Sequence, residues 1–120
     1  MTRAEPRGCL LDEDLDPALA DRLADALGWR VTSVRAEGWL GVKNGPLLQA
    51  MADAGLHVLV TGDRGLYAQR RAHLLRLGIG VVLVRDPARA AERLEAMARA
   101  VVHVDAGQLI EVEAAPPAQQ

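Results

Sequence analysis

The sequence predicts an α/β fold in which helices cover both faces of a central, mainly parallel sheet, giving a three-layer α/β/α sandwich. Short apolar runs alternate with amphipathic segments along the chain, which is the pattern of successive strands and crossover helices. The apolar runs are nearly uninterrupted, as expected for strands that are buried on both faces. Half of the 120 residues are hydrophobic and only 2% are aromatic, so we expect a core of Leu, Val and Ala.

The N-terminal elements form a strand, a helix and a second strand. The first strand is expected over residues 8–12. Asp16 is expected to cap the following helix, Pro17 to take its first position, and Gly28 to end it. The second strand is expected over residues 30–34, which completes one β-α-β unit.

The middle of the chain repeats this pattern twice. A second helix is expected to begin at Asn44, where the side chain can act as the N-cap, and to end at Gly55. A third strand is expected over residues 57–61, a third helix over 65–77 and a fourth strand over 80–84. Alternating strands and helices give a parallel sheet, in which the crossover connections are right-handed.

The last elements are expected to differ. Asp86 and Pro87 repeat the capping signature and predict a helix over residues 88–100. Two short apolar runs, 101–104 and 109–112, lie on either side of a tight turn, which predicts a C-terminal β-hairpin.

Length and composition limit the class of protein. Residues 1–113 are expected to form a single domain, and residues 114–120, made of Ala, Pro and Gln, a disordered tail. No stretch approaches the roughly 20 apolar residues of a membrane span, and the start of the chain lacks the apolar core of a signal peptide. The single Cys9 cannot form a disulfide within the chain, which fits a reducing compartment. We therefore expect a soluble cytoplasmic protein without membrane contact, whose formal charge of −2 provides no general attraction for nucleic acid.

Acidic residues gather where two apolar runs end. Asp12, Glu13 and Asp14 follow the first run, and Asp63 follows the third. If the first strand is central, the ligand crevice at the carboxyl ends of the strands lies between Asp12 and Asp63. Glu13 should point away from Asp12 if the strand stays extended, and Asp16 is better explained as a helix cap.

Converging carboxylates suit Mg²⁺ or Mn²⁺, which bind through one or two carboxylates together with substrate phosphate oxygens. Such a site activates water and stabilises the charge of a cleaved phosphodiester. The sequence therefore predicts a metal-dependent nuclease, with Asp12, Asp63 and Asp14 as the metal-binding and catalytic residues.

Four further residues are candidates for substrate binding. Thr61 has a hydroxyl that can bond an acid or a phosphate, and Arg64 and Lys43 can contact phosphate. Asn44 offers a neutral oxygen, although a role as helix N-cap explains it better.

Several of these segments together resemble the small PIN-like proteins. They are Leu10 to Leu15, Gly38 to Leu48, Val58 to Arg64 and the Val-rich C-terminal end, in this order and over about residues 8–113. The resemblance implies the sandwich fold described above, Mg²⁺- or Mn²⁺-dependent cleavage of RNA, and often the toxin role in a bacterial toxin–antitoxin pair. It implies an antitoxin as a partner in that case. A homodimer is also expected, because a small sandwich rich in Leu and Val commonly buries an apolar patch against a copy of itself.

The chain departs from the family pattern at two acidic positions. Asn44 stands where an acid is usual, and Arg64-Gly65-Leu66 replaces a segment that usually holds a further Asp and an aromatic residue. Two formal charges that would attract a divalent ion are therefore missing.

Two other functions stay open. A catalytically inactive PIN-like module that binds RNA or protein would explain the missing acids. A phosphotransfer protein of the receiver-like or haloacid-dehalogenase-like kind would use the acids with Thr61, but Arg85 stands where such a protein would need a lysine.

Overall fold

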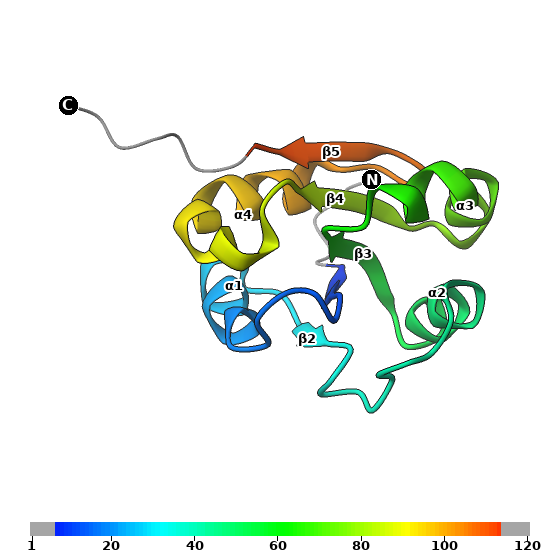
Figure 1. Ribbon diagram of the computed structural model, residues 1–120, viewed down its shortest axis with the longest axis horizontal. Coiled ribbons are helices and arrows are strands. Elements are labelled where there is room, and N and C mark those ends of the chain that lie inside the picture. The colour runs from blue at the N-terminus through cyan, green and yellow to red at the C-terminus, as the bar shows by residue number, and fades with distance from the viewer. Residues whose placement is uncertain (1–6, 114–120) are drawn as a thin grey trace.

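The computed structural model describes residues 7–113 and contains one five-stranded sheet (Figure 1). All four strand pairs are parallel, and the strand order is β2-β1-β3-β4-β5. The strands are β1 (Gly8–Leu11), β2 (Val31–Ser33), β3 (Leu56–Thr61), β4 (Gly80–Val84) and β5 (Leu109–Val112). The predicted α/β/α sandwich is therefore confirmed, whereas the tail expected at residues 114–120 lies outside the described residues.

Helices cover both faces of the sheet. They are α1 (Leu19–Leu27), α2 (Asn44–Asp53), α3 (Arg64–Leu77) and α4 (Leu94–His103), with a 3₁₀ segment, η1 (Pro87–Arg93), before α4. Figure 1 shows α1 and α4 on one side of the sheet and α2 and α3 on the other. In the part of the chain described by the structure, no helix has the length and apolarity that a membrane span requires.

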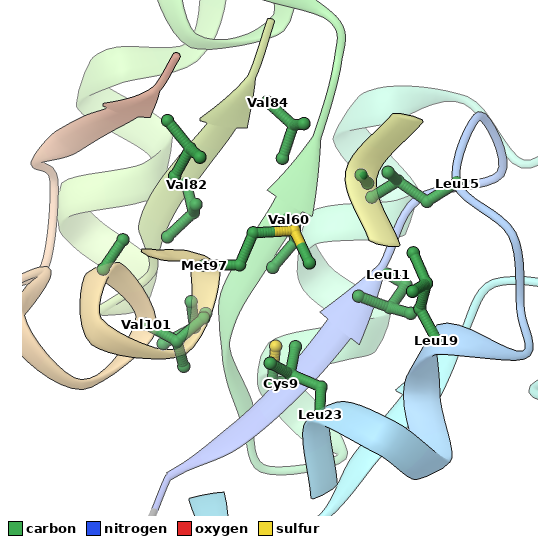
Figure 2. Close-up of a cluster of buried hydrophobic side chains, with 14 of the residues drawn as sticks. Cys9, Leu11, Leu15, Leu19, Leu23, Val60, Val82, Val84, Met97 and Val101 are labelled. Carbon is green, nitrogen blue, oxygen red and sulfur yellow. The ribbon is translucent and has the colours of Figure 1, made fainter. Parts of the chain in front are cut away.

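Two hydrophobic clusters hold the layers together, because successive side chains of a strand point to opposite faces. Cys9 and Leu11 of β1 pack with α1 and α4 in the cluster drawn in Figure 2, whereas Leu10 between them packs with α2 and α3. β3 divides its side chains in the same way, with Val58 and Val60 on one side and Leu59 on the other. On the central strands β1 and β3, the side chains that belong to these two clusters are fully buried.

The position of β1 inside the sheet creates a switch point. The connection from β1 passes through α1 to β2, whereas the connection from β3 passes through α3 on the opposite face to β4. In open α/β sheets the ligand crevice lies outside the carboxyl ends of two such neighbouring strands. Here those strands are β1 and β3.

The helix boundaries show which capping predictions are right. Gly28 ends α1 in the left-handed conformation, as predicted. The predicted start of α1 is wrong: Ala18 is at the N-cap position, so Pro17 lies before the helix, and Asp16 accepts a hydrogen bond from the Ala18 backbone N–H at 2.9 Å in the preceding turn. Asp86 makes no capping bond through its side chain. The predicted helix over residues 88–100 is replaced by the 3₁₀ segment followed by α4.

The predicted C-terminal β-hairpin is wrong. Val101 and His103 belong to α4, and β5 lies parallel to β4 rather than antiparallel to a preceding strand. Val101 is buried next to Met97 on one face of α4, which is helical spacing. A short apolar run has the same appearance in a buried helix end and in a strand, so the pattern alone misassigned it.

The connection from α4 to β5 passes close to Gly80 at the start of β4. A Cβ atom at Gly80 would lie 2.8 Å from the carbonyl oxygen of Asp105 and 2.9 Å from a methyl group of Val104.

We expect Gly80→Ala to lower the free energy of unfolding by about 1–3 kcal/mol, since overpacking forces the connection from α4 to β5 to move. Urea denaturation measures the effect. An unchanged midpoint would contradict this path of the chain between α4 and β5.

Candidate active site

The acidic residues that follow β1 and β3 line one pocket, as the order of the strands requires. Its volume is about 310 Å³. The lining residues are Asp12, Glu13, Asp14, Val34, Gly41, Val42, Asn44, Leu47 and Asp63. The three carboxylates that the sequence predicted as metal ligands are thus brought together from segments about 50 residues apart.

The buried hydroxyl of Thr61 connects the two strand ends. Its Oγ1 donates a hydrogen bond to Oδ2 of Asp12 at 2.6 Å and accepts one from the Asp63 backbone N–H at 3.0 Å. A bond from a hydroxyl to a carboxylate is charge-assisted and strong. Thr61 therefore fixes the Asp12 carboxylate and the start of the loop that carries Asp63, and its polar atom is engaged with the protein.

Asp14 joins the loop after β1 to the loop after β3. Its Oδ2 accepts a hydrogen bond from the Gly62 backbone N–H at 2.9 Å. Gly62 is needed for this contact, because a Cβ atom there would lie 2.6 Å from Oδ2 of Asp14 and would also collide with Pro87. The sequence offered no signal for this role of Gly62, since its cause is a contact between distant loops.

The pKa of Asp14 is raised above its ordinary value. Burial is the main cause, followed by the charge of Asp12 and, more weakly, that of Asp63, while the bond from Gly62 acts in the opposite direction. The negative charges of Asp12 and Asp63 are thus close enough to act on the carboxyl group of Asp14.

Asp63 has a structural role in addition to its place in the pocket. It is the N-cap of α3, and its Oδ1 accepts a hydrogen bond from the Leu66 backbone N–H at 3.2 Å. A capping carboxylate also interacts favourably with the helix dipole. The cap occupies Oδ1 and directs the Asp63 side chain to the edge of the pocket.

Glu13 also lines the pocket, contrary to the expectation that it points away. The chain leaves the extended conformation directly after β1, and the Leu15 N–H bonds the carbonyl oxygen of Asp12 in a turn at 3.1 Å. Alternation of side chains does not apply within a turn. Glu13 instead accepts a long hydrogen bond of 3.5 Å from the Gly41 backbone N–H.

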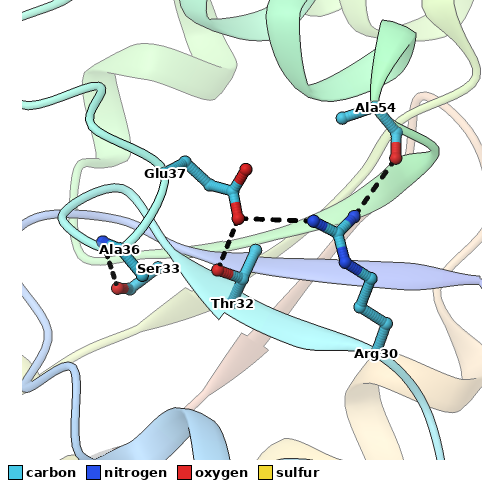
Figure 3. A network of polar contacts seen from close by, with 6 residues as sticks. All are labelled: Arg30, Thr32, Ser33, Ala36, Glu37 and Ala54. Carbon is cyan, nitrogen blue, oxygen red and sulfur yellow. Dashed lines mark hydrogen bonds and ion pairs between the residues drawn. The ribbon is translucent and has the colours of Figure 1, made fainter.

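The loop between β2 and α2 contributes Gly41 and Val42 to the lining of the pocket. Figure 3 shows the contacts that hold its start: Glu37 accepts hydrogen bonds from Thr32 at 2.8 Å and from Arg30 at 3.3 Å, and Arg30 also bonds the Ala54 carbonyl. These contacts tie edge strand β2 to the end of α2. The loop has no periodic pattern that would have placed it beside the carboxylates.

Asn44 lies in the pocket and not in the capping position that its residue type favoured. It is the first residue of α2, Lys43 precedes it at the N-cap, and no side chain caps the helix. Its amide is therefore available to the pocket. The interpretation of Asn44 as an N-cap is wrong, and its alternative role as a neutral oxygen ligand or substrate contact stays a prediction.

The predicted phosphate-binding cations lie outside the lining of the pocket. Arg64 forms an ion pair with Glu111 of β5, with 2.9 Å between nitrogen and oxygen. Lys43 is exposed just before α2. Arg70, at a kink in α3, lies against the first turn of α2, where a Cβ atom on Gly45 would be 3.4 Å from its guanidinium. Arg70 therefore lies beside the residue that follows Asn44.

The donor set suits a hard divalent cation. The polar side chains of the pocket offer only oxygen or amide atoms, which is the chemistry that Mg²⁺ and Mn²⁺ prefer. Within residues 7–113, no three His, Cys, Asp or Glu side chains are placed as a ready-made metal cage. Mg²⁺ is commonly held by one or two carboxylates together with substrate phosphate, so the residues fit an ion of that kind but not a fully protein-coordinated one.

The fold and the pocket together define a class: a doubly wound α/β protein with a carboxylate-lined crevice at its topological switch point. No family model, curated protein or solved structure matches the chain. The resemblance to PIN-like proteins therefore stays a prediction from the sequence.

Replacing Asp12 with Asn tests the coupling between the acids. We expect the pKa of Asp14 to fall in Asp12→Asn, because removing the neighbouring negative charge makes ionisation of Asp14 easier. Titration of the side-chain carboxyl carbons by NMR measures it. Asp16→Asn is the matched control, since Asp16 lies in the turn before α1 and is not among the groups that shift the pKa of Asp14. Equal pKa values of Asp14 in the wild type and Asp12→Asn would contradict the geometry.

Proposed function

We propose that the protein is a Mg²⁺- or Mn²⁺-dependent endoribonuclease whose active site is the acidic pocket. The observation that carries this proposal is the meeting of Asp12, Asp63 and Asn44 in one pocket at the switch point. They come from the ends of β1 and β3 and from the start of α2. Oxygen-bearing side chains from three elements seldom converge without a charged ligand, because clustered carboxylates repel each other.

In this proposal Asp12 and Asp63 hold the cation and Asp14 supports them from the adjacent loop. Asn44 provides a neutral oxygen at the position where PIN-like proteins usually carry an acid. The cation would stabilise the negative charge of the phosphodiester and lower the pKa of water at the site. Asp12 is well suited to direct binding, because Thr61 holds its carboxylate in one orientation before any ligand arrives.

The surroundings of the pocket favour a phosphate group as the remaining ligand. The N-termini of α2 and α3 both lie at its edge, where Asn44 and Asp63 are placed, and helix N-termini attract anions. Arg70 adds a guanidinium beside the first turn of α2. RNA as the particular substrate, and the toxin role with its antitoxin, rest on the resemblance to PIN-like proteins. The homodimer stays an expectation from the composition.

A second candidate is a catalytically inactive module that binds RNA or protein. It is favoured by Asn44, which carries no charge, and by the hydrogen bonds that Asp12, Asp14 and Asp63 already accept from the protein. The third function, phosphotransfer, would use the same acids with Thr61, but among the described residues the pocket lining lacks the cationic side chain that it needs. Arg85 after β4 pairs with Glu111 and Glu113 and is not part of the pocket lining.

Cleavage of single-stranded RNA tests the first function. We expect the wild type to cleave it with Mg²⁺ or Mn²⁺ and to stop in EDTA. Asp12→Asn should lower kcat more than about 100-fold, since removing a direct ligand costs more than removing an outer-sphere partner. Asp16→Asn should retain activity. RNA binding without cleavage in the wild type would instead identify the inactive module.

Restoring the missing charge provides a gain-of-function test. Asn44→Asp should raise the affinity for Mn²⁺ about tenfold, because it adds one negative charge within a few ångströms of the ion. Isothermal titration calorimetry with Mn²⁺ measures it, and Asn44→Ala, which adds no charge, is the matched control. An equal affinity of Asn44→Asp and wild type would show that position 44 does not face the cation.

A further inference from the structure

A second pocket lies between α4 and β5, and it shares no lining residue with the acidic pocket. Its volume is about 370 Å³. It is lined by Arg93, Ala96, Arg99, Ala100, His103, Ile110, Glu111, Val112 and Glu113. We call it the α4–β5 groove. Its lining combines alanine and aliphatic side chains with charged side chains.

The charges of the α4–β5 groove are unequally compensated. Glu111 pairs with both Arg64 and Arg85, and Glu113 pairs with Arg85. Among the residues described by the structure, the side chains of Arg93 and Arg99 have neither an ion pair nor a hydrogen bond. The acidic side of the groove is therefore neutralised from within the protein, and the basic side on α4 is not.

Arg93 is the most unusual of these groups. Its Nε is shielded from solvent and has no hydrogen-bond partner within residues 7–113. A buried donor without a partner has lost its hydration with nothing in return. A carboxylate bound in the groove would interact with this guanidinium and offset that loss.

The groove runs beside an open strand edge. The carbonyl oxygens of Gln108 and Val112 accept hydrogen bonds from the β4 side, so the alternate residues Leu109 and Glu111 direct their backbone groups away from the sheet. Figure 1 shows β5 at the edge, with no described element beyond it. An exposed edge of this kind can pair with an added strand.

We propose that the α4–β5 groove binds an extended, acidic segment of another protein, which adds to the open edge of β5. Its backbone pairs with Leu109 and Glu111, and its carboxylates face Arg93 and Arg99. Those carboxylates occupy every second position of the segment, because successive side chains of a strand point to opposite faces, and the side chains between them point away from α4. The proposal does not depend on the nuclease function, because the groove and the acidic pocket share no lining residue.

Charge argues against a second copy of this chain as the occupant. Two β5 edges paired in antiparallel fashion are related by a twofold axis perpendicular to the sheet, which would place the two α4 helices side by side. The uncompensated Arg93 and Arg99 of each copy would then approach those of the other. An acidic partner removes this repulsion, and a copy adds to it.

A short peptide of alternating Glu and Val residues, acetylated and amidated at its ends, tests the proposal on the full chain. We expect saturable shifts in the backbone amide NMR signals of Leu109, of Glu111 and of α4. The affinity for the peptide should fall at high salt, because its carboxylates pair with arginines. A peptide with Lys in place of Glu should cause none. Arg99→Glu should weaken binding about tenfold, whereas Arg35→Glu, near the opposite edge of the sheet, should leave it unchanged.

Arg93→Gln should also weaken binding, and the exposed Arg99 keeps the test valid if the change at Arg93 disturbs folding. The proposal is overturned if the acidic peptide causes no saturable shift at β5, if the Lys peptide binds equally well, or if Arg99→Glu binds like the wild type. Shifts at β5 that appear only with single-stranded RNA, or only as the protein concentration rises, would also overturn it. They would assign the groove to nucleic acid or to a second copy, respectively.

Discussion

The hydrogen bond from Thr61 to Asp12 is the contact on which the acidic pocket depends. It joins the carboxyl ends of β1 and β3, and the same hydroxyl accepts the Asp63 N–H. Since Thr61 is fully buried, its hydroxyl needs partners inside the protein, and the two loops supply them. The sheet sets the distance between the two strands, and the Thr61 hydroxyl connects the Asp12 side chain to the Asp63 backbone within one site.

The acidic pocket balances attraction for a cation against stability of the fold. Each of Asp12, Asp14 and Asp63 accepts a hydrogen bond from the protein, which stabilises a negative charge that the neighbouring acids oppose. The pKa of Asp14 is nevertheless raised, mainly by burial and further by the negative charge of Asp12. A cation or a change of protonation at this site would relieve the remaining repulsion. The neutral Asn44 keeps the repulsion between the acids lower, because an acid in its place would add another negative charge to the same pocket.

The acidic pocket and the α4–β5 groove lie at different strands of the sheet. The acidic pocket lies at β1 and β3, and the α4–β5 groove lies at the β5 edge. Arg64 links the two regions, because it follows Asp63 directly and yet its side chain pairs with Glu111. That pairing removes a cation from the acidic pocket and neutralises an acid in the groove. It therefore leaves one region more negative and the other more positive than the sequence suggests.

The sequence by itself determined the layers of the fold and the place where the acids meet. Continuous apolar runs and the glycine at residue 28 are local signals, and the carboxyl ends of neighbouring parallel strands share one edge by geometry. Only the tertiary structure decided that residues 101–103 complete a helix, since packing beside Met97 and not the local pattern selects between helix and strand. It also decided that Asn44 faces the pocket, that Arg64 turns to Glu111 and that Gly62 admits Asp14. These are contacts between distant segments, and no spacing along the chain encodes them.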